Sequence, residues 1–356
     1  MNAETRLKKC SEPLLDWYER CKRALPWRES PSPYHVWLSE IMLQQTRVEA
    51  VREYYRRFLE ALPDISALAA AEEDLLLKLW EGLGYYNRVR NLQKAAVRIM
   101  EEYDGEMPSR YDELLTLPGI GDYTAGAIAS IAFGRKTAAV DGNVLRVTAR
   151  ILADETDIGS PALKKSRKAE LESIMPADRP GAFNQALMDL GAMICVPNGA
   201  PHCKDCPLVA HCLACHRKLT DRLPQKASAK ERALQDRTVF VIRCRDRILI
   251  HKRPARGLLA GLYELPSADG HLTKKQALDH AASLGFIPLH IEALPASRHI
   301  FSHLEWRMKA YLIRADELAS PDAPGQDYRL ETPRTIARDI SIPSAFSAYA
   351  PFIREA

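Results

Sequence analysis

The sequence of 356 residues contains no apolar run near the ~18 residues that a membrane-spanning helix requires. Its first segment, MNAETRLKKCSEPLLDWYERCK, lacks the continuous apolar stretch of a secretory signal peptide. The sequence as a whole also contains no internal repeat and no low-complexity tract. We therefore expect a cytoplasmic protein that has no membrane partner.

The composition fits a globular protein with a sizeable core, since 46% of the residues are hydrophobic and 27% are charged. The length predicts about two or three domains. A net charge of +4 is only mildly basic, so it is compatible with nucleic acid but not diagnostic. The eight cysteines are unevenly placed, with five of them between positions 195 and 215. In a cytosolic chain this clustering favours metal binding over disulfides.

Hydrophobic periodicity divides the chain into two parts. Residues 1–215 have helical spacing, and the polar segment 216–236 is predicted to be a linker. From residue 237 to 356 the period changes to two, and TVFVIRCRDRILIHKR predicts two strands around a turn at Arg245–Asp246. Helices near 274–284 and 344–354 complete a small α+β domain.

Several helices are expected in the first part, separated by proline and glycine signals. The segment SEIMLQQTRVEAVREYYRRFLE predicts one long helix that starts at Ser39 and Glu40. The other expected helices are 11–24, 72–80, 88–103, 110–116, 121–133, 142–152, 161–174 and 181–194.

The cysteine cluster gives the strongest chemical signal. Cys195, Cys203, Cys206 and Cys212 are spaced C-x7-C-x2-C-x5-C, and four thiolates suit either Zn²⁺ or a [4Fe–4S] cluster. Structural zinc sites usually pair two C-x2-C knuckles, and these four ligands contain only one. The spacing therefore favours iron–sulfur, with Cys215 free. Reduced surface cysteines without a ligand are the third possibility.

A glycine turn and two carboxylates form a second set of candidates. Gly119 and Gly121 bracket a turn that can present backbone N–H groups to a DNA phosphate at a helix start, or can simply connect two helices. Glu40 lies among apolar residues, where first-turn pairing with the helix dipole is the alternative. Asp141 precedes a helix in AVDGNV, where N-capping is the alternative.

In combination, these pieces resemble the helix–hairpin–helix DNA glycosylases of the endonuclease III superfamily, and most of all the adenine DNA glycosylase (MutY) family. The resemblance spans nearly the whole chain. It is carried by LPWR, SEIMLQQT, WEGLGYYNRVRNL, LPGIGDYTAGAI, AVDGNVLRV, FNQALMDLGAMIC and FSHLEW. One departure is the first cysteine loop, which has seven intervening residues where the family more often has six.

The resemblance implies a helix–hairpin–helix domain with an iron–sulfur loop at 195–212, followed by a Nudix-like domain. It also implies catalytic roles for Glu40, which protonates adenine, and for Asp141, which stays ionised and stabilises the sugar cation. Asn143 would orient Asp141 or water, and Tyr123 would contact both carboxylates. Related lyases carry a lysine where this chain has Tyr123, and a phenol cannot form a Schiff base.

Further positions match the family's DNA contacts, although packing, a solvated charge or, for the glycines and residues 301–303, an ordinary turn could explain them. The matching residues are Arg23, Trp27, Leu43 and Gln185 in the adenine pocket, Gln45 and Tyr85 as wedges in the base stack, Gly119 and Gly121 at a phosphate, and Phe301, Ser302 and His303 at 8-oxoguanine. In the Nudix-like domain, TKKQALDHAASLG has only Asp279 as a carboxylate. We therefore expect a recognition module and not a pyrophosphatase.

The expected function is removal of adenine mispaired with 8-oxoguanine or guanine, by hydrolysis and without an efficient lyase step. The expected partner is double-stranded DNA that carries such a mispair, bound by a monomer associated with the nucleoid. Three alternatives remain. They are a bifunctional glycosylase/lyase for oxidised pyrimidines, a Nudix-type hydrolase with a helical appendage, and a non-catalytic iron–sulfur DNA-binding or redox-sensing protein.

Overall fold

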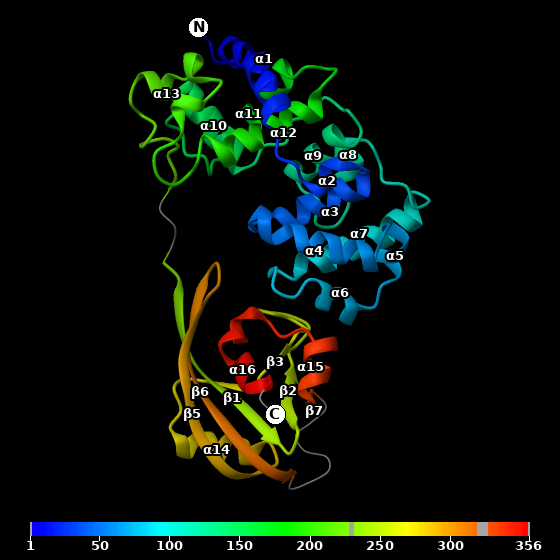
Figure 1. Cartoon of the computed structure of the whole chain (residues 1–356), viewed down its shortest axis with the longest axis vertical. Helices are drawn as coiled ribbons and strands as arrows, with labels where there is room; N and C mark the ends of the chain where they lie inside the picture. Colours follow the sequence, from blue (N-terminus) through cyan, green and yellow to red (C-terminus); the bar gives the residue numbers. More distant parts are fainter. Residues whose placement is uncertain (1, 228–230, 319–326, 355–356) are drawn as a thin grey trace. The chain divides into compact units, whose positions relative to one another are not determined.

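The computed structural model describes residues 2–227, 231–318 and 327–354 (Figure 1). Its contacts divide the chain into two compact units. One comprises Met1–Ala71 and Arg90–Ser228, and the other comprises Glu72–Val89 and Ala229–Ala356. Part of the predicted linker, residues 228–230, lies outside the described residues. None of the described helices combines the length and the apolar character of a membrane span.

The part of the chain up to residue 216 is helical, as the periodicity predicts. Its elements are α1 (Ala3–Cys21), α2 (Pro26–Glu29), α3 (Pro33–Leu43), α4 (Val48–Ala61), α5 (Ile65–Ala70), α6 (Glu73–Leu79), α7 (Asn87–Glu102), α8 (Tyr111–Leu114), α9 (Asp122–Ile131), α10 (Gly142–Leu152), α11 (Pro161–Ile174), α12 (Pro180–Met193), the short 3-10 turns η1 (Cys203–Asp205) and η2 (Val209–His211), and α13 (Leu213–His216).

A core cluster in the first unit joins helices that lie far apart in the sequence. Apolar side chains of α1, α10, α11 and α12 pack together, among them Leu15, Val147, Leu171 and Leu190. These helices lie next to one another in Figure 1. Their packing fixes the start of α10, where Asp141 lies, against α12.

The prediction of one long helix that starts at Ser39 and Glu40 is wrong. Helix α3 begins earlier, because the Ser32 hydroxyl accepts a hydrogen bond from the His35 backbone N–H and Pro33 occupies the first turn. It ends at Leu43, and Gln45 then adopts a left-handed φ of 59° before α4 starts. Glu40 is consequently near the end of α3, so pairing with the dipole of a first turn is excluded.

The second unit contains a mixed seven-stranded sheet with the order β3-β2-β1-β6-β5, in which β4 pairs with β1 and β7 with β2. Its elements are β1 (Ala233–Cys244), β2 (Arg247–Lys252), β3 (Tyr263–Glu264), β4 (Ser267–Asp269), α14 (Lys274–Ser283), β5 (Phe286–Ile300), β6 (Leu304–Leu318), β7 (Tyr328–Glu331), α15 (Pro333–Asp339), the 3-10 turn η3 (Ser344–Tyr349) and α16 (Ala350–Arg354). The predicted hairpin at Arg245–Asp246 is confirmed, since Arg243 pairs with Ile248.

Both faces of the sheet are covered by helices of the same unit. Helix α14 packs on one face through Ala277 and Ala281. Residues from α15, η3 and α16 cover the other face, where Trp306 and Met308 of β6 are buried. The period of two that the sequence shows after residue 237 is visible in β6, because every second residue from Leu304 to Ala310 packs into this core.

Candidate active site

A cavity of about 510 Å³ lies in the first unit, and the predicted catalytic residues line it. Helix α3 contributes Glu40, α9 contributes Tyr123, and Asp141 and Asn143 come from the start of α10. The other lining residues are Arg23, Leu25, Trp27, Arg28, Val36, Ser39, Leu43, Gln44, Gln45, Thr46, Val48, Ile131, Gln185, Met188 and Ala192.

Glu40 is a buried acid held by a single tyrosine. Its residue surface is only 7% exposed, and the Tyr123 hydroxyl donates a hydrogen bond to its Oε2 atom at 2.6 Å. Burial raises the pKa of the Glu40 carboxyl to about 7, although the Tyr123 hydrogen bond opposes this rise. Burial, together with the nearby Glu40 charge, also raises the pKa of Tyr123 well above its usual value. Glu40 can therefore hold a proton near neutral pH, while Tyr123 stays a neutral donor.

Asp141 has more donors than Glu40. It is the N-cap of α10 and accepts the Val144 backbone N–H at 2.8 Å, which confirms the capping interpretation. Asn143 Nδ2 donates to the second carboxylate oxygen at 2.9 Å. Burial raises the pKa of Asp141, and these donors counter the rise. The cap therefore does not compete with a catalytic role, because it uses one oxygen and helps to keep the carboxylate charged.

An arginine behind Asp141 fixes the orientation of the Asn143 amide. Arg146 Nη2 donates to Asn143 Oδ1 at 2.8 Å and to the Gly191 carbonyl at 2.9 Å, and its Nε donates to the Cys195 carbonyl at 2.8 Å. Because the amide oxygen is engaged by Arg146, the amide NH₂ group must point toward Asp141.

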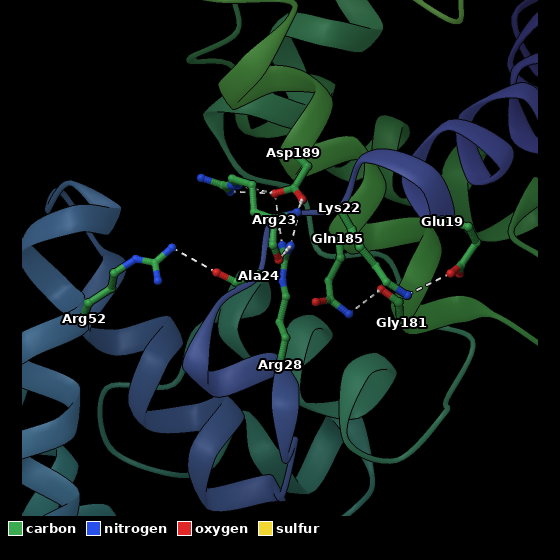
Figure 2. A network of polar contacts seen from close by, with 9 residues as sticks. All are labelled: Glu19, Lys22, Arg23, Ala24, Arg28, Arg52, Gly181, Gln185 and Asp189. Carbon is green, nitrogen blue, oxygen red and sulfur yellow. Dashed lines mark hydrogen bonds and ion pairs between the residues drawn. The ribbon is translucent and has the colours of Figure 1, made fainter.

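A buried ion-pair network forms another part of the site (Figure 2). Asp189 of α12 is fully buried and pairs with Arg23 at 2.6 Å and with Arg28 at 2.7 Å. Although burial opposes its charge, the two guanidinium groups hold the pKa of Asp189 below its usual range. Gln185, one turn earlier on α12, donates to the Gly181 carbonyl at 3.4 Å. The guanidinium of Arg23 is thus tied to Asp189, while Arg28 carries a positive charge that acts on Glu40.

The predicted pocket residues are brought together in this cavity. Arg23, Trp27, Leu43 and Gln185 all line it, and so does Gln45 from the break between α3 and α4. Trp27 is largely buried and packs edge-to-face against Tyr55, so its side chain both packs in the core and lines the cavity.

Tyr85, the second predicted wedge residue, belongs to the other unit. It is 50% exposed and adopts a left-handed φ of 48°, with the Arg88 guanidinium 5.6 Å from its ring centre. Gln45 also has a positive φ, and such strained non-glycine conformations concentrate at functional sites.

The 301–303 segment forms the turn between β5 and β6. The Phe301 backbone N–H donates to the Leu304 carbonyl, and its ring packs against Trp306 at 4.9 Å. Ser302 and His303 are exposed, and their side chains approach to 3.4 Å. The hairpin therefore anchors one aromatic residue and presents two hydrogen-bonding side chains to solvent.

The glycine turn before α9 has the expected geometry. Gly119 has a φ of 78°, and a side-chain carbon there would lie 2.8 Å from the Asn91 side chain, so glycine is required. Gly121 is the N-cap of α9, and nothing lies within 4 Å of a side-chain carbon built on it. The first turn of α9, which carries Tyr123, is therefore approachable from outside.

Five cysteines line one small cavity in the first unit, together with Arg150 of α10. The five are Cys195, Cys203, Cys206, Cys212 and Cys215. Arg150 Nη1 donates to Cys195 Sγ at 3.2 Å. Among the described residues, no three His, Cys, Asp or Glu side chains are arranged to hold a single metal ion.

The Nudix-like unit does not gather carboxylates on α14. Across Lys274–Ser283, all of which is described, Asp279 is the single acidic residue. Glu264 of β3 is buried and already paired with Arg253 at 2.6 Å and with His251 at 3.2 Å. The carboxylate of Glu264 is therefore engaged by side chains of its own unit.

Both parts of the chain match known protein families. Residues 38–176 match the HhH-GPD superfamily of base excision DNA repair proteins, and residues 238–350 match the NUDIX domain. The adenine DNA glycosylase of Mus musculus is 36% identical over 371 residues, which cover 87% of this chain and 72% of the relative. The chain belongs to the adenine DNA glycosylase family. The family and the fold class inferred from the sequence motifs are thereby confirmed.

Solved structures agree with the adenine DNA glycosylase assignment at the level of the fold. A thermostable thymine-DNA glycosylase, 28% identical, matches with a TM-score of 0.55 over 60% of this chain and 98% of its own. An endonuclease III in a non-covalent complex with DNA, 24% identical, matches with a TM-score of 0.53 over 62% and 99%.

Sequence reasoning missed three polar residues that shape the site. Arg28 lines the cavity, Asp189 pairs with both Arg28 and Arg23, and Arg146 orients Asn143. Arg28 and Asp189 do stand in the quoted motifs LPWR and FNQALMDLGAMIC. Their pairing joins residues 161 positions apart, so no local pattern could have indicated it.

Proposed function

We propose that this protein removes adenine from double-stranded DNA in base excision repair, by hydrolysing the N-glycosidic bond of adenine paired with 8-oxoguanine or guanine. The observation that carries the proposal is the buried Glu40–Tyr123 pair, which shares one cavity with Asp141. A flipped adenine has to enter such a pocket before the bond can be cleaved.

Glu40 supplies the proton for the leaving base. A general acid is most effective when its pKa lies near the working pH, and the pKa of Glu40 is about 7. Asp141 remains charged and stabilises the positive charge that develops on the sugar. Asn143 holds its carboxylate in place. The two acids thus take different roles because their donors differ.

Tyr123 distinguishes hydrolysis from strand cleavage. Its hydroxyl donates to Glu40 and contacts Met188, and it has no amine that could form a Schiff base with the sugar. The test is an adenine-release assay on a duplex with one A:8-oxoguanine pair, run with and without alkali. Adenine release with an intact strand until alkali is added supports the proposal. Strand nicking without alkali, or release of oxidised pyrimidines in place of adenine, contradicts it.

The remaining positions hold the DNA around this chemistry. Arg23, Trp27, Leu43 and Gln185 form the walls that receive adenine, and all of them line the cavity. Gln45 and Tyr85 wedge the base stack, a role that suits their strained backbones. The N–H groups of the turn from Gly119 to Gly121 bind a phosphate at the start of α9.

The β5–β6 turn reads the oxidised base opposite adenine. Phe301 is anchored on Trp306, while Ser302 and His303 present hydrogen-bonding groups to solvent. Ser302→Ala should therefore slow adenine release from A:8-oxoguanine by about five-fold, since one hydrogen bond contributes ~1 kcal/mol. Release from A:G should not change. Ser283→Ala, which removes an exposed hydroxyl from α14 of the same unit, is the control. Equal losses on both substrates contradict the recognition role.

The cysteine cavity fits a [4Fe–4S] cluster held by Cys195, Cys203, Cys206 and Cys212. All four thiols line it, and the Arg150 guanidinium donates to Cys195 Sγ at 3.2 Å. All four cysteines follow α12, so a bound cluster would close the segment from Cys195 to Cys212 on itself, beside Arg150 of α10. Iron and sulfide analysis of anaerobically purified protein tests this assignment, and stoichiometric zinc without iron refutes it.

A further inference from the structure

Cys215 adds a second C-x2-C pair to the single one found among the four proposed ligands. Cys203 and Cys206 form a C-x2-C knuckle, and Cys212 and Cys215 form a second one. Helix α13 begins directly after Cys212, so residues three apart lie on one face of its turn. The helix therefore turns Cys215 toward the same side as Cys212, into the cavity that both residues line.

Within this cavity, Cys215 is the cysteine that acts most strongly on Cys203. Two of the other proposed ligands have different partners, because Cys195 Sγ accepts from Arg150 Nη1 and Cys212 Sγ donates to the Arg150 carbonyl at 3.5 Å. Within the described residues, these contacts leave two thiols at the Cys203 corner of the cavity.

We propose that Cys203 and Cys215 are interchangeable ligands at this corner, so that Cys215 completes the four-thiolate set when Cys203 is lost. This inference rests on the cluster proposed above. The exchange is redox-neutral, because the thiol that becomes the ligand gives up a proton and the thiol that leaves takes one up. In the intact protein Cys203 is the ligand and Cys215 remains in the cavity as a free thiol.

Five forms of the full-length chain test the proposal. They are the wild type, Cys203→Ala, Cys215→Ala, the double variant Cys203→Ala/Cys215→Ala, and Cys195→Ala as the control at a corner with no second thiol. The first readout is iron and sulfide per chain together with the visible absorption of the cluster. The second is alkylation of the native protein with iodoacetamide, mapped by mass spectrometry, because a metal-bound thiolate is protected.

We expect each single variant at the shared corner to keep more than about half of the wild-type iron. The double variant and Cys195→Ala should keep less than about a tenth, since four cysteine ligands are needed. Cys215 should be alkylated in the wild type and protected in Cys203→Ala. Iron loss in either single variant as deep as in the double variant overturns the proposal, and so does equal labelling of Cys215 in both proteins.

A folding failure is separated from ligand loss by a second pair, Cys203→Ser and Cys203→Ser/Cys215→Ala, in which the side chain at residue 203 keeps its size. Equal iron in these two proteins overturns the inference even when the alanine variants are insoluble. If the wild type contains no iron, the cluster assignment fails and takes this inference with it. If the wild type contains iron and Cys203→Ala does not, only the interchange of ligands fails.

Discussion

Replacing Tyr123 by phenylalanine removes the hydroxyl that donates to Glu40 at 2.6 Å and leaves the ring in place. That hydrogen bond favours the charged form of Glu40, so it lowers a pKa that burial has raised to about 7. Without it the carboxylate is less stable, and the pKa of Glu40 must rise further. The substitution thus tests both the role of Glu40 and the contact that tunes it.

The size of the shift follows from the strength of the bond. A hydrogen bond to a charged group contributes ~1.5–3 kcal/mol, and one pKa unit corresponds to ~1.4 kcal/mol, so the pKa should rise by about one to two units. At pH 8 the protonated fraction of Glu40 would then increase from about a tenth to about half or more. An enzyme that needs protonated Glu40 loses activity as the pH rises through this pKa, so the fall should move to higher pH.

The assay is adenine release from an A:8-oxoguanine duplex between pH 5 and 9. The duplex concentration is kept well below KM, so that the rate reports kcat/KM. Under these conditions the profile reports the pKa values of the free enzyme. The position of the alkaline fall, and not the maximal rate, is the readout. Tyr111→Phe is a matched control, because Tyr111 donates to the carboxylate of Asp122 at 2.9 Å outside the cavity. An unmoved alkaline limb in Tyr123→Phe, or an equal shift in Tyr111→Phe, refutes the reasoning.

Further changes probe the same cavity. Tyr123→Lys should form a borohydride-trappable complex with an abasic duplex, and its absence would show that residue 123 does not face the sugar. The folded-state pKa of Glu40 lies above its unfolded value of 4.5, so stability is lost as pH rises from about 4.5 to 7. Glu40→Gln should therefore raise the free energy of unfolding by about 3 kcal/mol at pH 8 and hardly at pH 4, measured in urea. Asp189→Asn should lower this free energy by ~3 kcal/mol by leaving two partly buried arginines without their buried carboxylate, whereas Glu19→Gln in an exposed pair should change it little.

Elements with strong local signals could be predicted from the sequence. Helix α10 has the predicted bounds because Asp141 caps it, and α11 does because Ser160 and Pro161 start it. The β1–β2 hairpin was also predictable, since strand periodicity changes over two turn residues. In the site, Glu40, Tyr123 and Asp141 were found through motifs, and their meeting in one cavity is what the fold adds.

The parts that could not be predicted depend on contacts between distant residues or on a competing local signal. The break after α3 was missed because apolar spacing continues through it, while the positive φ of Gln45 stops the helix. The pairing of Asp189 with Arg23 and Arg28 was missed because those residues are isolated charges in the sequence, and they come together only when α12 packs beside the segment that carries the two arginines.

Two buried carboxyl groups in one cavity would both take up protons if burial acted alone, and the arrangement of donors separates them. Glu40 receives the neutral hydroxyl of Tyr123, whereas Asp141 receives the Val144 N–H and the Asn143 amide. That amide cannot turn its oxygen toward Asp141, because Arg146 occupies the oxygen side. Arg146 is fixed in turn by the carbonyls of α12 and its following loop. The donors that counter the effect of burial on the pKa of Asp141 are therefore set by the packing of α10 on α12, on the far side of Asn143 from the carboxylate.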